Sequence, residues 1–172
     1  TAARASTGLT SLTFATGGAT IVIGNDVAAP QIGKSIRLFV IDTSPFDTDD
    51  FEQNSGFEVK SVKKTFINPI MIDESGENAS FEEGCLSIPN IREHINRKSD
   101  ITIKYQDENF THHQETFSGI LARVIQHEYD HLEGTLFTDK ISPFKKKLIK
   151  GKLNNIMIGK VSVDYKMKFF KK

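Results

Sequence analysis

The sequence predicts an α+β fold in which mostly antiparallel strands surround one central helix, with a C-terminal helix and strand. Three observations indicate this fold. Ile36–Asp42 is a continuous run of mostly apolar residues typical of a buried strand. Residues 101–117 hold two strand-like segments separated by a polar turn. Between residues 119 and 133, apolar side chains recur at helical spacing. A mostly antiparallel sheet that packs against a helix on one face belongs to the α+β class.

The first half of the chain contains fewer regular signals. Residues 1–23 are rich in Thr, Ala, Ser and Gly and indicate no clear element. Residues 43–62 combine Ser-Pro with Asn-Ser-Gly and no apolar period, so we expect a surface loop that could form a lid. Thr65–Ile72 resembles a strand interrupted by Asn68-Pro69, and Asp73–Asn78 resembles a turn.

The second half has a clearer order of elements. Ile101–Tyr105 alternates with period two, and Phe110–Phe117 returns after a polar turn, which predicts a hairpin. Ser118 is a plausible N-cap for a helix from Gly119 to about Glu133, ended by Gly134. We expect a second helix over Phe144–Ile158 and a last strand over Val161–Phe170.

Length and composition favour one globular domain. A chain of 172 residues suffices for one core and is short for two. No apolar run approaches the roughly 18 residues of a membrane span, and the N-terminal segment lacks the pattern of a secretory signal. The single cysteine cannot form an internal disulfide, so a reducing cytosol is the expected location. We expect residues 1–172 to form a single domain.

The net charge of zero hides an asymmetry. Residues 140–172 contain eleven lysines and one acidic residue, whereas residues 1–139 contain 11 basic and 21 acidic residues. A basic segment on an acidic body is either a solvated helix face or a surface for RNA or another polyanion.

The central helix carries the sequence His127-Glu128-Tyr129-Asp130-His131. Residues four apart share one helical face, so both imidazoles can reach one ion, and Glu128 can address a bound water. A catalytic site needs a third protein ligand. No His follows His131, and Glu133 is too close on the same helix, which leaves Cys85 as the best candidate. Taken alone, Cys85 could also be a buried apolar residue or a nucleophile.

Three segments, in order, resemble the motifs of peptide deformylases. They are Gly24–Gln31 (GNDVAAPQ), Glu83–Ser87 (EGCLS) and Gln126–His131 (QHEYDH). The resemblance extends over roughly residues 24–143. It implies a metal-dependent amidase that removes the N-formyl group from formyl-methionyl nascent polypeptides and releases formate. It also implies a ferrous ion, with Zn²⁺, Ni²⁺ or Co²⁺ as possible substitutes. We expect no membrane or DNA partner, and the basic residues 140–172 suggest a contact with the ribosome.

The resemblance also implies residue roles. The metal ligands would be Cys85, His127 and His131, with Glu128 as general acid/base. Gln31 and the backbone N–H of Leu86 would stabilise the oxyanion, and Glu83 and Arg97 would form a bracing ion pair. The substrate-binding residues are expected to be Asp26, Val27, Glu83, Gly84, Arg92, Ile120 and Val124, with Ile120 and Val124 lining the methionine pocket.

Two features depart from the family pattern, and two other functions stay open. Asp26 stands where the family normally has a second glycine of its first motif, and residues 1–23 do not resemble the helix that usually precedes it. The alternatives are a zinc endopeptidase of the His-Glu-x-x-His type and a non-catalytic structural zinc module. The first requires a downstream ligand, and the second usually requires a fourth protein ligand.

Overall fold

The computed structural model describes residues 4–5, 21–23, 26–47, 49, 61–165 and 167–168. A six-stranded sheet has the order β3-β4-β5-β6-β7, with β2 paired to β5, and β1 and β8 form a separate pair. The strands are β1 (Arg4–Ala5), β2 (Ile21–Ile23), β3 (Val27–Ala28), β4 (Leu38–Asp42), β5 (Lys63–Cys85), β6 (Ile88–Gln106), β7 (His112–Ser118) and β8 (Met167–Lys168). The helices are α2 (Gly119–Leu132) and α3 (Pro143–Met157), with 3₁₀ turns η1 (Ala29–Ile32), η2 (Ser44–Phe46) and η3 (Phe137–Asp139).

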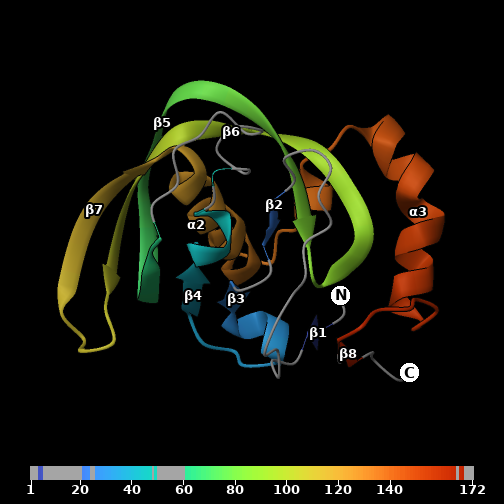
Figure 1. Ribbon diagram of the computed structural model, residues 1–172, viewed down its shortest axis with the longest axis horizontal. Helices are drawn as coiled ribbons and strands as arrows, with labels where there is room; N and C mark the ends of the chain where they lie inside the picture. Colours follow the sequence, from blue (N-terminus) through green and yellow to red (C-terminus); the bar gives the residue numbers. More distant parts are fainter. Residues whose placement is uncertain are drawn as a thin grey trace.

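Strands β5 and β6 form a long antiparallel pair that curves around α2 (Figure 1). The expected turn at Asp73–Asn78 is wrong, because these residues lie within β5. A register shift between Ser75 and Asn78 marks a local irregularity, and Gly76 there has a φ of 76°. Such irregularities bend a strand without ending it, and only glycine adopts this φ without strain. The chain therefore continues as a strand through a segment with the composition of a turn.

Helix α2 lies inside the curve of the sheet and packs against the main core (Figure 1). Its apolar face includes Ile120, Val124 and Ile125, which join Phe39 and Phe66 in one buried cluster. Burying one such side chain stabilises the fold by about 1.5–3 kcal/mol. The α+β prediction and the predicted central helix are confirmed. This packing fixes the helix that carries the His-Glu-x-x-His sequence.

The ends of α2 differ slightly from expectation. Ser118 occupies the N-cap position, but its hydroxyl donates to the Asp100 carboxylate and makes no capping bond. Gly134 follows the helix with a φ of 72°, as expected of a residue that ends a helix. The hairpin of β6 and β7 is also confirmed, with its turn near Asp107.

Helix α3 packs outside the curved sheet, beside the start of β6 (Figure 1). Ile149, Leu153 and Ile156 lie on one helical face against Ile88 and Ile95. The predicted second helix is therefore confirmed.

The predicted strand over Val161–Phe170 is confirmed only at β8. Residues 161–165 follow an irregular path, and positions 166, 169 and 170 lie outside the described residues. Most of residues 1–23 and of the expected lid at 43–62 also lie outside them. Within the described residues, no helix is both long and apolar enough to span a bilayer.

Candidate metal centre and active site

Three potential ligands converge between β5 and α2. Cys85 ends β5, and His127 and His131 lie one turn apart on α2. The cysteine sulfur and one ring nitrogen of each histidine lie within 4.8 Å of one another. All three side chains are buried, and the distance from Cys85 Sγ to His131 Nε2 is 3.4 Å. The structure thus brings together the three residues that the sequence suggested as metal ligands.

The hydrogen bonding of His127 fits a bound cation. Its Nδ1 lies 3.0 Å from Glu83 Oε2, whereas its Nε2 is buried without a hydrogen-bond partner. A proton held on Nδ1 by the carboxylate leaves a lone pair on Nε2, the tautomer that ligates metals. An unpartnered buried nitrogen is costly to the fold. A divalent cation among the three ligand atoms would give this nitrogen a partner.

Burial keeps two of the proposed ligands uncharged. It raises the pKa of the Cys85 thiol to about 12, with a smaller contribution from the charge of Glu128. It also lowers the pKa of His131 to about 3, followed by the effects of His127 and Arg97. A neutral imidazole is ready to ligate, while the thiol must lose its proton to a binding cation. A protonated thiol also makes Cys85 a poor nucleophile in the metal-free protein.

An ion network surrounds Glu83, which is completely buried. Arg97 donates to both of its oxygens at 2.7 and 3.0 Å, and Arg123 donates to Oε1 at 3.0 Å. Arg97 also pairs with Asp130 at 2.7 Å. The Glu83 carboxylate therefore orients His127, and because Glu83 is fully buried between β2 and β6, the substrate contact that we expected of it stays a prediction. Desolvation opposes ionisation, but the bonds from His127 and Arg97 lower the pKa of Glu83 overall.

Glu128 faces the same interior. It is 1% exposed, and its Oε2 has no hydrogen-bond partner. Burial raises the pKa of this carboxyl well above its ordinary value, and the charge of Asp26 adds to the shift. Asp26 is itself buried, and its Oδ1 accepts from the Asp42 N–H at 2.6 Å. Desolvation raises the pKa of Asp26 to about 7. The residue that replaces the family glycine thus places a second buried carboxyl near enough to influence the general acid/base candidate.

Gln31 and Leu86 lie on either side of Cys85. The Gln31 amide donates to Ser87 Oγ at 3.1 Å and lies 3.7 Å from Cys85 Sγ. Its oxygen accepts from the Ala28 N–H at 2.7 Å, which fixes the side chain in place. Leu86 follows Cys85 in the tight turn before β6. Both expected oxyanion donors are therefore close to the proposed metal site.

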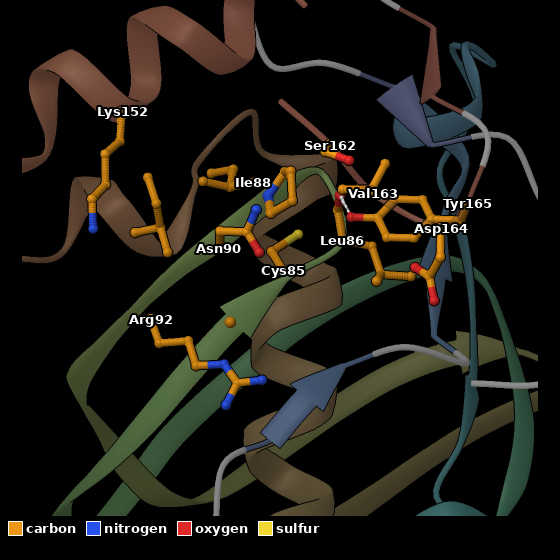
Figure 2. Close-up of a pocket in the computed structure, with 13 residues that line it drawn as sticks. Cys85, Leu86, Ile88, Asn90, Arg92, Lys152, Ser162, Val163, Asp164 and Tyr165 are labelled. Atoms are coloured by element: carbon orange, nitrogen blue, oxygen red, sulfur yellow. Dashed lines mark hydrogen bonds between the residues drawn. The ribbon is translucent and has the colours of Figure 1, made fainter. Parts of the chain in front are cut away.

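A cavity of about 870 Å³ opens beside Cys85 (Figure 2). Its lining includes Gly84, Leu86 and Arg92, together with Lys152 of α3 and Tyr165. Two of the expected substrate-binding residues, Gly84 and Arg92, therefore lie in the wall of a cavity next to the site.

The other expected substrate residues are located elsewhere. Ile120 and Val124 are buried in the main core and do not line this cavity. Val27 lies half-buried in β3. The structure thus does not bring the proposed methionine-pocket residues to the cleft beside Cys85, and that role stays a prediction.

Sequence reasoning missed Arg123 and Tyr165. Arg123 lies four residues before His127, so helical spacing placed it on the ligand face and could have revealed it. Tyr165 donates to the Leu86 carbonyl at 2.8 Å from a position 79 residues away. No local pattern reports a contact of that range.

A buried cysteine and two histidines that could hold a metal ion, beside a carboxyl, are an arrangement typical of a metal-dependent hydrolase. The family model for polypeptide deformylase matches residues 9–147. This chain belongs to the polypeptide deformylase family. Enzymes of this family remove the N-formyl group from nascent peptides in a metal-dependent reaction.

Individual relatives agree. The peptide deformylase of Flavobacterium psychrophilum is 56% identical over 150 residues, covering 87% of this chain and 77% of the relative. That of Salinibacter ruber is 42% identical, covering 83% and 72%. The solved deformylase of Plasmodium falciparum superposes with a TM-score of 0.66 at 35% identity, covering 79% of this chain and 73% of that one. The endopeptidase and structural-zinc alternatives are therefore not favoured.

Proposed function

We propose that this chain hydrolyses the formyl amide of N-formyl-methionyl polypeptides with Cys85, His127 and His131 as metal ligands and Glu128 as general acid/base. The observation that supports these roles best is that two buried polar atoms of the site have no hydrogen-bond partner. His127 Nε2 and Glu128 Oε2 are both buried without partners, on adjacent residues of α2. We further propose that residues 1–172 act as one catalytic unit in the bacterial cytoplasm, where a free cysteine such as Cys85 stays reduced.

A bound divalent cation would supply positive charge that acidifies water and polarises the formyl carbonyl. Cys85, His127 and His131 would hold it, the thiol proton being released on binding. We propose Fe²⁺ as the native ion, with Zn²⁺, Ni²⁺ or Co²⁺ as substitutes, because a sulfur and two imidazoles accept all four. The Glu83 carboxylate keeps His127 in the ligating tautomer.

The protein's own groups would carry the protons and stabilise the charge. Glu128 Oε2 receives a proton from the attacking water and delivers it to the leaving amine nitrogen. The products are formate and a peptide with a free amino terminus. The Gln31 amide and the Leu86 N–H donate to the oxygen that becomes negative, and losing one such donor typically costs about 3–4 kcal/mol of barrier.

The substrate would lie along the cavity beside Cys85. Its backbone would meet Gly84 and Val27, and Arg92 would contact a carbonyl further along the peptide. Asp26 would lie beside the substrate, where the family normally has a glycine. We propose that its carboxyl adds negative charge near Glu128. The methionine side chain would require access to Ile120 and Val124.

The Glu128→Gln variant tests the central role. We expect metal content close to that of the unmodified protein and a kcat for a formyl-Met peptide lower by about 10²- to 10⁴-fold, because the amide cannot transfer the proton. Metal analysis and initial-rate kinetics provide both readings. Glu133→Gln, at the exposed end of the same helix, is the matched control and should change neither. A parallel loss of metal from Glu128→Gln would mean that Glu128 is a ligand.

A second proposal concerns α3, the core of the basic segment. Lys147 and Lys150 are exposed, as are the apolar side chains of Phe144 and Leu148. Lys145 and Lys146 instead pair with Glu93 and Asp139. We propose that this exposed face docks the enzyme on ribosomal RNA beside its nascent substrate. Each phosphate neutralised releases counterions, so binding should weaken steeply with salt.

Co-sedimentation with ribosomes tests this docking. The double variant Lys147→Glu/Lys150→Glu should lose ribosome association at low salt while retaining turnover of a free formyl-peptide. Lys34→Glu/Lys104→Glu makes the same change in charge at exposed positions elsewhere and should still sediment. Equal sedimentation of both double variants would contradict docking through α3.

A further inference from the structure

The turn that links β5 to β6 joins two proposed functional groups. Cys85 pairs with Ile88 in the antiparallel register, so Leu86 and Ser87 alone form the turn. Two-residue hairpin turns are favoured when one or both central residues have positive φ. Neither Leu86 nor Ser87 does. Because this backbone is not the preferred one for so short a turn, contacts from outside the hairpin matter for its geometry.

Two such contacts come from distant parts of the chain. Gln31 reaches Ser87 Oγ from the N-terminal side. Tyr165 comes from the C-terminal part of the chain, and its hydroxyl donates to the Leu86 carbonyl at 2.8 Å (Figure 2). The Leu86–Ser87 peptide unit is the middle unit of the turn, the one that rotates when a β-turn changes type. A bond to this carbonyl therefore restrains the soft torsion of the turn.

The segment that carries Tyr165 is positioned for this contact. Residues 162–165 form one side of the cavity beside Cys85, with Lys152 of α3 on the opposite side (Figure 2). Tyr165 is half-buried, and its ring points toward Leu86. Burial raises the pKa of its phenol to about 12, so the hydroxyl remains a donor across the neutral range. A tertiary role at the turn also explains why this segment is irregular although its sequence alternates like a strand.

We propose that Tyr165 is a positioning residue for the deformylase reaction: by holding the Leu86 carbonyl it fixes the backbone of Leu86, so that the Leu86 N–H, which lies in the preceding peptide unit, stays directed at the developing oxyanion. This inference rests on the proposed function, in which that N–H is a donor. The donor meets charge that exists only in the transition state. Loss of the restraint should therefore lower kcat and leave KM nearly unchanged.

The Tyr165→Phe variant removes the hydroxyl and keeps the ring. With a formyl-Met peptide we expect kcat to fall about 3- to 10-fold, the loss that corresponds to one neutral hydrogen bond. KM should stay within about twofold, since ground-state contacts are intact. In the metal-free protein, amide hydrogen exchange over residues 82–90 should become faster, because the turn opens more often.

Tyr105→Phe is the matched control. It also deletes a tyrosine hydroxyl bond, the one to Glu115 Oε1 at 2.7 Å, but on the far hairpin. It should lower the melting temperature without changing kcat or exchange over residues 82–90.

Three results would overturn the positioning role. They are an unchanged kcat in Tyr165→Phe, a rise in KM alone, and exchange over residues 82–90 equal to that of the unmodified protein. Absence of deformylase turnover in the unmodified, metal-loaded protein would instead refute the proposed function, while the exchange measurement would still report whether Tyr165 restrains the turn.

Discussion

Two polar clusters in this protein use similar groups in opposite surroundings. The buried cluster lies between α2 and the curved pair β5–β6, next to the proposed metal ligands. It consists of Glu83, Arg97, Arg123, His127 and Asp130. The edge cluster lies on the β6–β7 hairpin and the start of β5. It consists of Lys64, Tyr105, Asp107, His113 and Glu115.

The two clusters differ in the exposure of their ion pairs more than in the length of those pairs. The pair Arg97–Glu83 is 3% and 0% exposed at 2.7 Å, whereas Lys64–Glu115 is 27% and 35% exposed at 2.5 Å. Charges removed from water must satisfy one another fully, and deleting one partner leaves an uncompensated charge. A partly exposed pair regains water when it is broken. Only the buried cluster can therefore hold a ligand such as His127 in one orientation.

The variant Glu83→Gln should give the largest effect on stability. It leaves Arg97 and Arg123 buried beside a neutral group, so we expect the free energy of unfolding to fall by about 3–5 kcal/mol. Urea denaturation of the metal-free protein measures it. Glu115→Gln is the matched control in the edge cluster and should cost about 0.2–1 kcal/mol. High salt should remove most of the control's effect and little of the Glu83 effect. Equal losses in the two variants would mean that burial does not distinguish the clusters.

The same contrast explains which elements could be predicted from sequence. Helix α2 can be recognised from neighbouring residues alone, because its apolar side chains recur at helical spacing and Gly134 follows its end. Strand β5 has no such signal between residues 72 and 78. All seven residues are exposed, so apolar and polar side chains do not alternate there between a buried and an exposed face. A strand that is polar on both faces resembles a turn, and its pairing with β6 alone keeps it extended. The error at Asp73–Asn78 followed from this.

The candidate site divides in the same way. The two histidines and Glu128 lie within five residues, so their convergence follows from helical geometry. Cys85 was predictable because it is the only thiol in the chain. The contacts that Arg123 makes with Glu83 and Ile95, and that Tyr165 makes with Leu86, join segments 28 to 79 residues apart. Helical spacing could place Arg123 on the ligand face, but the partners of both residues depend on the path of the whole fold.

A smaller effect should appear in the dependence of stability on pH. The pKa of Glu83 is lowered, since bonds from His127 and Arg97 outweigh the desolvation that opposes them. The pKa of Glu115 is also lowered, against desolvation, through bonds from Lys64 and Tyr105. A carboxyl with a lowered pKa in the folded state stabilises the protein above its ordinary pKa and loses that contribution as pH falls. Other buried groups shift in both directions, so comparison with the variants is needed to isolate each carboxyl.

We therefore expect the stability difference between the unmodified protein and Glu83→Gln to be constant from pH 8 to about 5 and to shrink below the ordinary glutamate pKa of 4.5. The difference for Glu115→Gln should shrink from the same point, with a smaller amplitude, because water and salt already screen that carboxylate. Urea denaturation of the three metal-free proteins at half-unit pH steps measures both curves. A Glu83 difference that stays constant down to about pH 3 would mean that the partners of Glu83 do not stabilise its ionised carboxylate in the folded protein.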